Sequence, residues 1–77
     1  MIVQLTSDVK TNGVAANLEA LQALLTEAAK RASEAREHMR KGECNGAVGA
    51  VLGLDDVLDG AKTLYQAVLV LHRSTLR

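Results

Sequence analysis

The sequence predicts an all-α protein: an antiparallel hairpin of two helices with a short N-terminal arm, which self-associates into a four-helix bundle. Three observations support this fold class. Apolar residues recur at alternating intervals of four and three through most of the chain, as they do in packed helices. The chain contains no proline that would break a long helix. At 77 residues it is near the size at which one core is marginal, so a second chain is expected to complete it.

Residues 1–13 are expected to form the arm of a single domain that spans 1–77. Ile2, Val3 and Leu5 favour an extended chain, and Asn12 with Gly13 is typical of a turn before the first helix. A single helical turn fits this segment equally well. The arm is predicted either to lie over the second helix of a neighbouring chain or to fray.

The first helix is expected to span about 14–41. Its back carries oppositely charged residues one turn apart, which is typical of a solvated surface. Its apolar positions form an unbroken heptad seam, which consists of Val14, Leu18, Leu21, Leu25, Ala28, Ala32, Ala35 and Met39.

A turn is predicted at 42–45. Gly42 suits the left-handed conformation that commonly ends a helix, and Asn45 is a residue type that caps the next one. Because this connection is short, the two helices should be antiparallel neighbours.

The second helix is expected to run without a break from about 46 to about 73. Its apolar positions satisfy two overlapping heptad seams, so one neighbouring helix cannot cover them. A third stripe of mostly small residues includes Gly49, Gly53 and Gly60, which would let another backbone approach closely. Curvature or fraying near the start of the helix is the alternative explanation for these glycines. The expected interface, for a homodimer, a higher oligomer or a partner, comprises Gly49, Gly53, Val57, Gly60, Leu64, Tyr65, Val68 and Leu71.

The charges balance, with 9 lysines and arginines against 9 aspartates and glutamates, so no overall field draws the chain to a polyanion. Glu34 and Glu37 lie among the basic residues of segment 30–41 and weaken any phosphate binding there, so a solvated face is the simpler interpretation. The candidate nucleic-acid patch in this segment consists of Lys30, Arg31, Arg36, Arg40 and Lys41.

The side chains that could carry chemistry do not form an active site in the sequence. Asp55, Asp56 and Asp59 form an acidic cluster, for which charge pairing with basic residues across the hairpin is the simpler explanation. Cys44 has no second cysteine to pair with, and a closed zinc site would lack ligands. No nucleophile–base pair or phosphate-cradling loop is present. We therefore expect no enzyme activity, no catalytic residue, no metal and no cofactor.

The two histidines have structural explanations. His38 follows Glu34 by one turn and is expected to pair with it at the surface, whereas His72 falls on the apolar face and is expected to be partly buried. The uncharged runs are shorter than the roughly 20 residues that span a bilayer, and no signal segment begins the chain. A cytoplasmic protein without membrane contact is therefore expected.

In layout, the charged first helix, the glycine-containing turn and the apolar second helix resemble small hairpin proteins that act as secretion chaperones or as mobile-element inhibitors of host proteins. The layout is also similar to that of dimeric RNA-binding hairpins of the Rop type. Both resemblances rest on architecture. The leading expectation is a non-enzymatic interaction module that dimerises through the second helix and binds or sequesters a protein partner, as a regulatory inhibitor or a chaperone-like protein. The alternatives are a Rop-like RNA- or DNA-binding hairpin, and sequestration of a small ligand such as a nucleotide between protomers.

Overall fold

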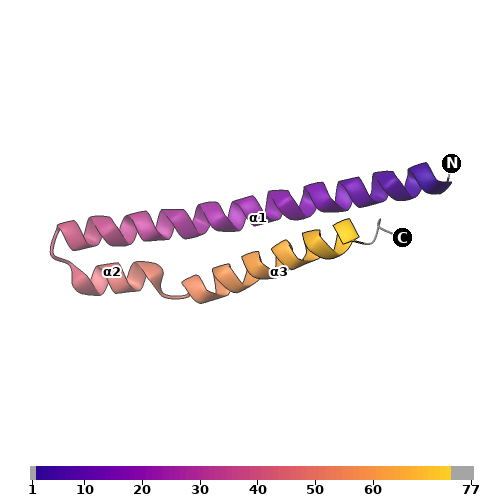
Figure 1. The fold of residues 1–77 in the computed structure, drawn as a ribbon. Coiled ribbons are helices and arrows are strands. Elements are labelled where there is room, and N and C mark those ends of the chain that lie inside the picture. Colours follow the sequence, from indigo (N-terminus) through magenta and orange to yellow (C-terminus); the bar gives the residue numbers. More distant parts are fainter. Residues whose placement is uncertain (1, 74–77) are drawn as a thin grey trace.

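A computed structural model shows the chain as a long helical hairpin (Figure 1). The structure describes the backbone of residues 2–73 and the side chains of residues 9–73. It contains α1 (Ile2–Arg40), α2 (Cys44–Val51) and α3 (Leu54–Arg73). Both shorter helices pack along α1, and the hairpin measures 61 × 14 × 13 Å. The predicted all-α hairpin is confirmed, and its self-association stays a prediction.

Gly42 has the predicted left-handed conformation, with a φ of 78° that glycine adopts without strain. The connection is shorter than the predicted 42–45, because α1 ends at Arg40 and α2 begins at Cys44. The Gly42 amide donates to the Met39 carbonyl at 3.0 Å, and the Glu43 amide donates to the His38 carbonyl at 2.8 Å. These bonds satisfy carbonyls at the end of α1. The capping role predicted for Asn45 is wrong, because α2 already begins at Cys44 and its N-cap residue is Glu43.

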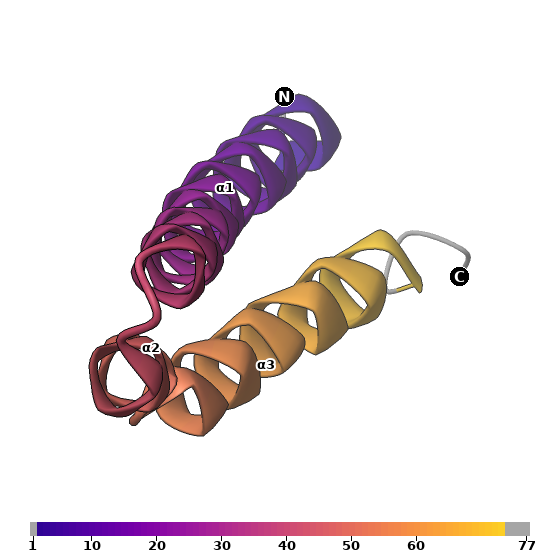
Figure 2. The same ribbon diagram turned by 90° about the vertical axis from the view of Figure 1, so that its left-hand side faces the viewer.

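The prediction of an unbroken second helix is wrong. Leu52 is extended, with φ −62° and ψ 135°, and Gly53 is left-handed, with φ 82°. The Arg31 guanidinium donates from Nη1 to the Leu52 carbonyl at 3.1 Å and so satisfies an acceptor at the break. α2 and α3 therefore meet at an angle, as the end-on view in Figure 2 shows.

The N-terminal segment is helical in the structure, because α1 begins at Ile2. The turn expected at Asn12 and Gly13 is absent there, and both residues lie within the helix. The last turns of α3 give this part of α1 a packing partner: a Cβ on Gly13 would lie 3.3 Å from Leu71 Cδ1. The Lys10 ammonium donates to the His72 carbonyl at 3.4 Å. Met1, the first residue of the predicted arm, lies outside the described residues.

The hairpin interface shares only half of the seam predicted for α1. Heptad position a is half-buried as expected, but the other half-buried row is position d, and the predicted position e is exposed. The rotation of α1 is set by contacts at position d, where Leu24 packs against Gly60 and Arg31 reaches the break. In α1, position a comprises Val14, Leu21, Ala28 and Ala35; position d comprises Asn17, Leu24, Arg31 and His38; position e comprises Leu18, Leu25, Ala32 and Met39.

The α3 side of the interface follows the same heptad, with an alternating a and d row of buried or half-buried residues. Position e of α3 is exposed, as it is in α1. In α3, position a comprises Leu54, Ala61 and Val68; position d comprises Val57, Leu64 and Leu71; position e comprises Leu58, Tyr65 and His72.

The core of one hairpin is thin. Among the described side chains, only those of Ala47 and Ala61 are buried. The chain exposes 5996 Å², whereas a compact folded monomer of 8.2 kDa exposes about 4,500 Å². One chain therefore leaves open a large area that a globular protein of the same mass would cover.

Candidate interaction face

Five large apolar side chains at position e remain between 47% and 54% exposed in the single chain. Leu18, Leu25 and Met39 belong to α1, and Leu58 and Tyr65 belong to α3. We refer to this set, together with Ala32, as the e face.

The two helices present their e positions on the same side of the hairpin. In an antiparallel pair, position e of each helix flanks the a and d seam on one side, and position g flanks it on the other. The register is fixed by the contact of Gly60 with Leu24, where a Cβ would lie 3.1 Å from Leu24 Cδ1, and by that of Gly13 with Leu71. In this register Leu18 lies level with Tyr65, and Leu25 with Leu58.

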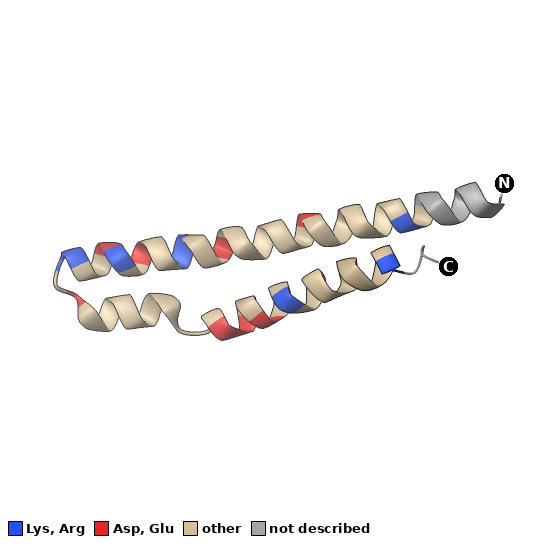
Figure 3. Cartoon of the chain, viewed as in Figure 1, with Lys and Arg blue, Asp and Glu red and all other residues tan. Residues whose placement is uncertain are grey.

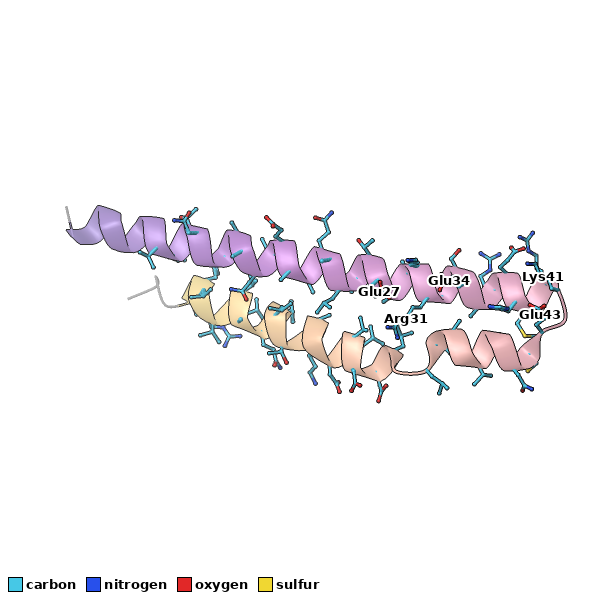
Figure 4. All side chains as sticks on the ribbon, turned by 180° about the vertical axis from the view of Figure 1, so that it is seen from behind. Glu27, Arg31, Glu34, Lys41 and Glu43 are labelled. Atoms are coloured by element: carbon cyan, nitrogen blue, oxygen red, sulfur yellow. The ribbon has the colours of Figure 1, made fainter. Side chains whose placement is uncertain are left out.

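The opposite side of the hairpin is polar or small. Glu27 and Glu34 occupy position g of α1, and both are labelled in the view from behind in Figure 4. Glu27 accepts a hydrogen bond from Arg31 Nε at 2.9 Å, and this bond lowers the pKa of the Glu27 carboxyl below its ordinary value. Charged residues also gather near the α2 end of α1 and at the start of α3 (Figure 3). The e face, which is uncharged, is therefore the more apolar side.

Two open depressions adjoin the e face, one beside each helix. They give the surface a relief into which side chains of another helix can insert. The first is lined by Leu18, Leu21, Gln22, Leu25, Thr26 and Ala29, and the second by Tyr65, Gln66, Leu69, Val70 and Arg73.

The residues predicted as an interface on the second helix are divided by the structure. Most of them lie in the seam with α1, and Tyr65 lies on the e face. Gly49 faces open space, and Gly53 belongs to neither helix, so the small-residue stripe is not a continuous surface. The predicted residues in the seam with α1 are Val57, Gly60, Leu64, Val68 and Leu71.

Sequence reasoning did not single out the outward position of Leu18, Leu25 and Met39. Hydropathy alone favours the opposite arrangement, because position d of α1 contains the polar residues Asn17 and Arg31 while position e is apolar throughout. Position d nevertheless lies inward, where Leu24 contacts Gly60 and Arg31 bonds the Leu52 carbonyl.

The candidate nucleic-acid patch is also divided. Arg31 is half-buried in the hairpin, where it contacts Glu27 and the Leu52 carbonyl, and Arg40 pairs with Glu37. Four of the five basic residues of the patch are exposed, and these are Lys30, Arg36, Arg40 and Lys41.

The histidines differ from their predicted positions. His38 Nδ1 lies 2.8 Å from Glu43 Oε1, so its partner is Glu43 and not Glu34. The prediction fails because the chain reverses after α1 and brings Glu43 back against the imidazole. His72 is exposed and not partly buried, because it occupies position e of α3.

The acidic cluster makes no ion pair with the basic residues of α1 in the described part of the chain, contrary to expectation. Asp55 and Asp56 instead lie in the first turn of α3, where the helix dipole favours negative charge. Within residues 9–73, no three His, Cys, Asp or Glu residues are grouped as metal ligands. Cys44 is exposed at the start of α2.

No helix of the described residues has the length and apolar character needed to cross a membrane. Comparison of the chain with protein-family models, curated proteins and solved structures gives no match.

Proposed function

We propose that the chain is a non-enzymatic, cytoplasmic protein-interaction module that self-associates and binds or sequesters a protein partner. The observation that carries this proposal is that the large apolar side chains lie at the surface and not in the core. The described core contains only two buried alanines, whereas large apolar side chains lie open on all three helices. Larger exposed patches formed by such side chains typically mark interaction sites.

Part of this surface lies outside the e face. Val48 and Leu52 are exposed on α2 and at its end, and Leu52 is the most exposed large apolar residue described, at 68%. An amphipathic helix of another protein could lay its apolar side against such residues. Binding there would prevent that helix from reaching its own target, which is the basis of sequestration.

The test compares capture by the native chain with capture by a Val48→Ser, Leu52→Ser double variant. Both proteins would be immobilised and exposed to a lysate of the source cells, and circular dichroism would verify equal helicity. We expect a protein retained only by the native chain, which then forms a complex of defined mass with the purified chain. Retention of the same proteins by both would contradict the proposal.

The other two expectations have weaker support. A Rop-like nucleic-acid role is weakened because Arg31 is half-buried in the hairpin and Glu37 lies beside the exposed Arg40. Binding to mixed RNA that weakens steeply above about 50 mM salt would revive it. Ligand sequestration between protomers has only the two open, largely apolar depressions to rest on.

A further inference from the structure

We infer that the e face is covered by a second copy of this chain, so that two hairpins form a four-helix bundle with their e faces in contact. This inference rests on the proposed self-association and specifies its surface. The proposed interface is therefore formed by residues of α1 and α3, and not by the small-residue stripe predicted on the second helix.

The residue pattern of α1 and α3 is that of helices in a four-helix bundle. A helix that faces a bundle core is apolar at positions a and d and at either e or g. α3 is apolar at a and d and adds Leu58 and Tyr65 at e. α1 goes further, because its outward row at position e is more apolar than its inward row at position d, which contains Asn17 and Arg31. A single hairpin thus leaves the more apolar of these two α1 rows in water.

The open area matches what a stable dimer requires. The single chain exposes roughly 1,500 Å² more than a compact monomer of its mass would. Each partner in a typical stable complex buries about 800 Å². The e face extends from Leu18 to Met39, or about 32 Å along α1 at 1.5 Å per residue. The surplus of the whole chain is larger than the area that one partner of such a complex buries, and Val48 and Leu52 do not belong to the e face.

The e face is compatible with a copy of itself. In a twofold dimer, the same patch of both chains is in contact. A charged residue on that patch would therefore lie close to the identical charge of the partner chain. None of the six residues of the e face is charged, so contact between two e faces leaves no ion without a partner. His72, the next position e of α3, lies one heptad beyond Tyr65 and outside this face. The level pairs Leu18 with Tyr65 and Leu25 with Leu58 would supply the apolar layers.

The test is a matched pair of leucine-to-glutamate substitutions. Leu25→Glu places a charge in the middle of the e face, and Leu52→Glu places the same charge at an exposed leucine at the helix break. Sedimentation velocity should give the native chain twice its 8.2 kDa mass at micromolar concentration. We expect Leu25→Glu to raise the dimer dissociation constant by at least about 100-fold, and Leu52→Glu to leave it within about threefold.

A native monomer at every concentration would overturn the inference, and so would a Leu25→Glu variant that keeps the native dimer mass. In the second case self-association, and with it the proposed function, would stand through another surface. Partner capture is scored separately at Val48 and Leu52, so the two ideas can fail independently.

A measurement on the unmodified chain covers the case in which Leu25→Glu fails to fold. Tyr65 is the only aromatic residue of the sequence and lies on the e face, so iodide quenching of tyrosine emission reports on that face alone. We expect the quenching constant to rise severalfold as dilution converts dimer to monomer. A constant that stays the same across that change in mass would show that the dimer leaves the e face uncovered.

Discussion

Gly49 and Gly53 offer the sharpest test of the broken second helix. They are four residues apart and both exposed, but only Gly53 has a positive φ, of 82°. Gly49 lies within α2, and a Cβ added there would meet nothing within 4 Å. Alanine is therefore expected to stabilise the chain at one position and destabilise it at the other.

The magnitudes follow from backbone conformation. Gly49→Ala should raise the free energy of unfolding by about 0.5–1 kcal/mol, the helix-propensity difference between the two residues. Gly53→Ala forces an L side chain into the left-handed region at a cost of about 1–2 kcal/mol, part of which the reduced entropy of the unfolded chain offsets. Crowding adds little, because the Cβ would be 3.5 Å from Arg31 Nη1, an ordinary contact.

The assay is urea unfolding followed by circular dichroism, with all proteins at one concentration. If the same proteins are unfolded by heat, a difference of 1 kcal/mol in the free energy of unfolding corresponds to a shift of about 4–8 °C in Tm for a domain of this size. Gly42→Ala is the matched control for Gly53→Ala, because Gly42 also has a positive φ and open space around it. A lower urea midpoint for Gly49→Ala would show that Gly49 is needed in a close helix contact. A higher midpoint for Gly53→Ala would show that the second helix is continuous.

Two further predictions concern the residues at the break. Arg31→Lys should lower the free energy of unfolding, measured in urea, by about 1 kcal/mol. A lysine ammonium cannot reproduce the two hydrogen bonds that the planar guanidinium makes to Glu27 and to the Leu52 carbonyl. An unchanged urea midpoint would refute this role. Because Arg31 lowers the pKa of Glu27 below 4.5, the stabilisation by the ionised carboxylate is complete above pH 4.5 and is lost as the pH falls through the lowered pKa. Glu27→Gln should therefore be less stable than the native chain at pH 7 and approach it in acid, and a difference that is constant with pH would contradict this.

The parts of the fold that the sequence predicted depend on local signals. The heptad repeat and the absence of proline predicted the long helices, and Gly42 marked the reversal that makes them antiparallel. The break was not predictable in the same way. A glycine tolerates both signs of φ, so the residue type of Gly53 does not distinguish a small-residue contact from the left-handed link that the structure shows.

The rotation of α1 depends on distant contacts. Val14 and Leu21 belong to both possible seams, and the choice of Leu24 or Leu25 as the inward leucine is decided by Gly60 on α3 and by the contact of Arg31 with Leu52. These pairs lie at least 21 residues apart in the chain, and the heptad pattern of α1 alone contains no information about them. For the same reason, the sequence predicted that apolar surface would be left open but did not indicate the face on which it lies.

The most direct test of the central claim, that one hairpin leaves too much apolar surface uncovered to be stable alone, is Tm as a function of protein concentration. If folding is coupled to pairing of two chains, mass action makes Tm rise with concentration. Across a hundredfold range we expect a steady increase, with a sedimentation mass of twice 8.2 kDa at the upper end. A Tm that does not change over that range, for a helical chain that sediments at 8.2 kDa throughout, would contradict the claim.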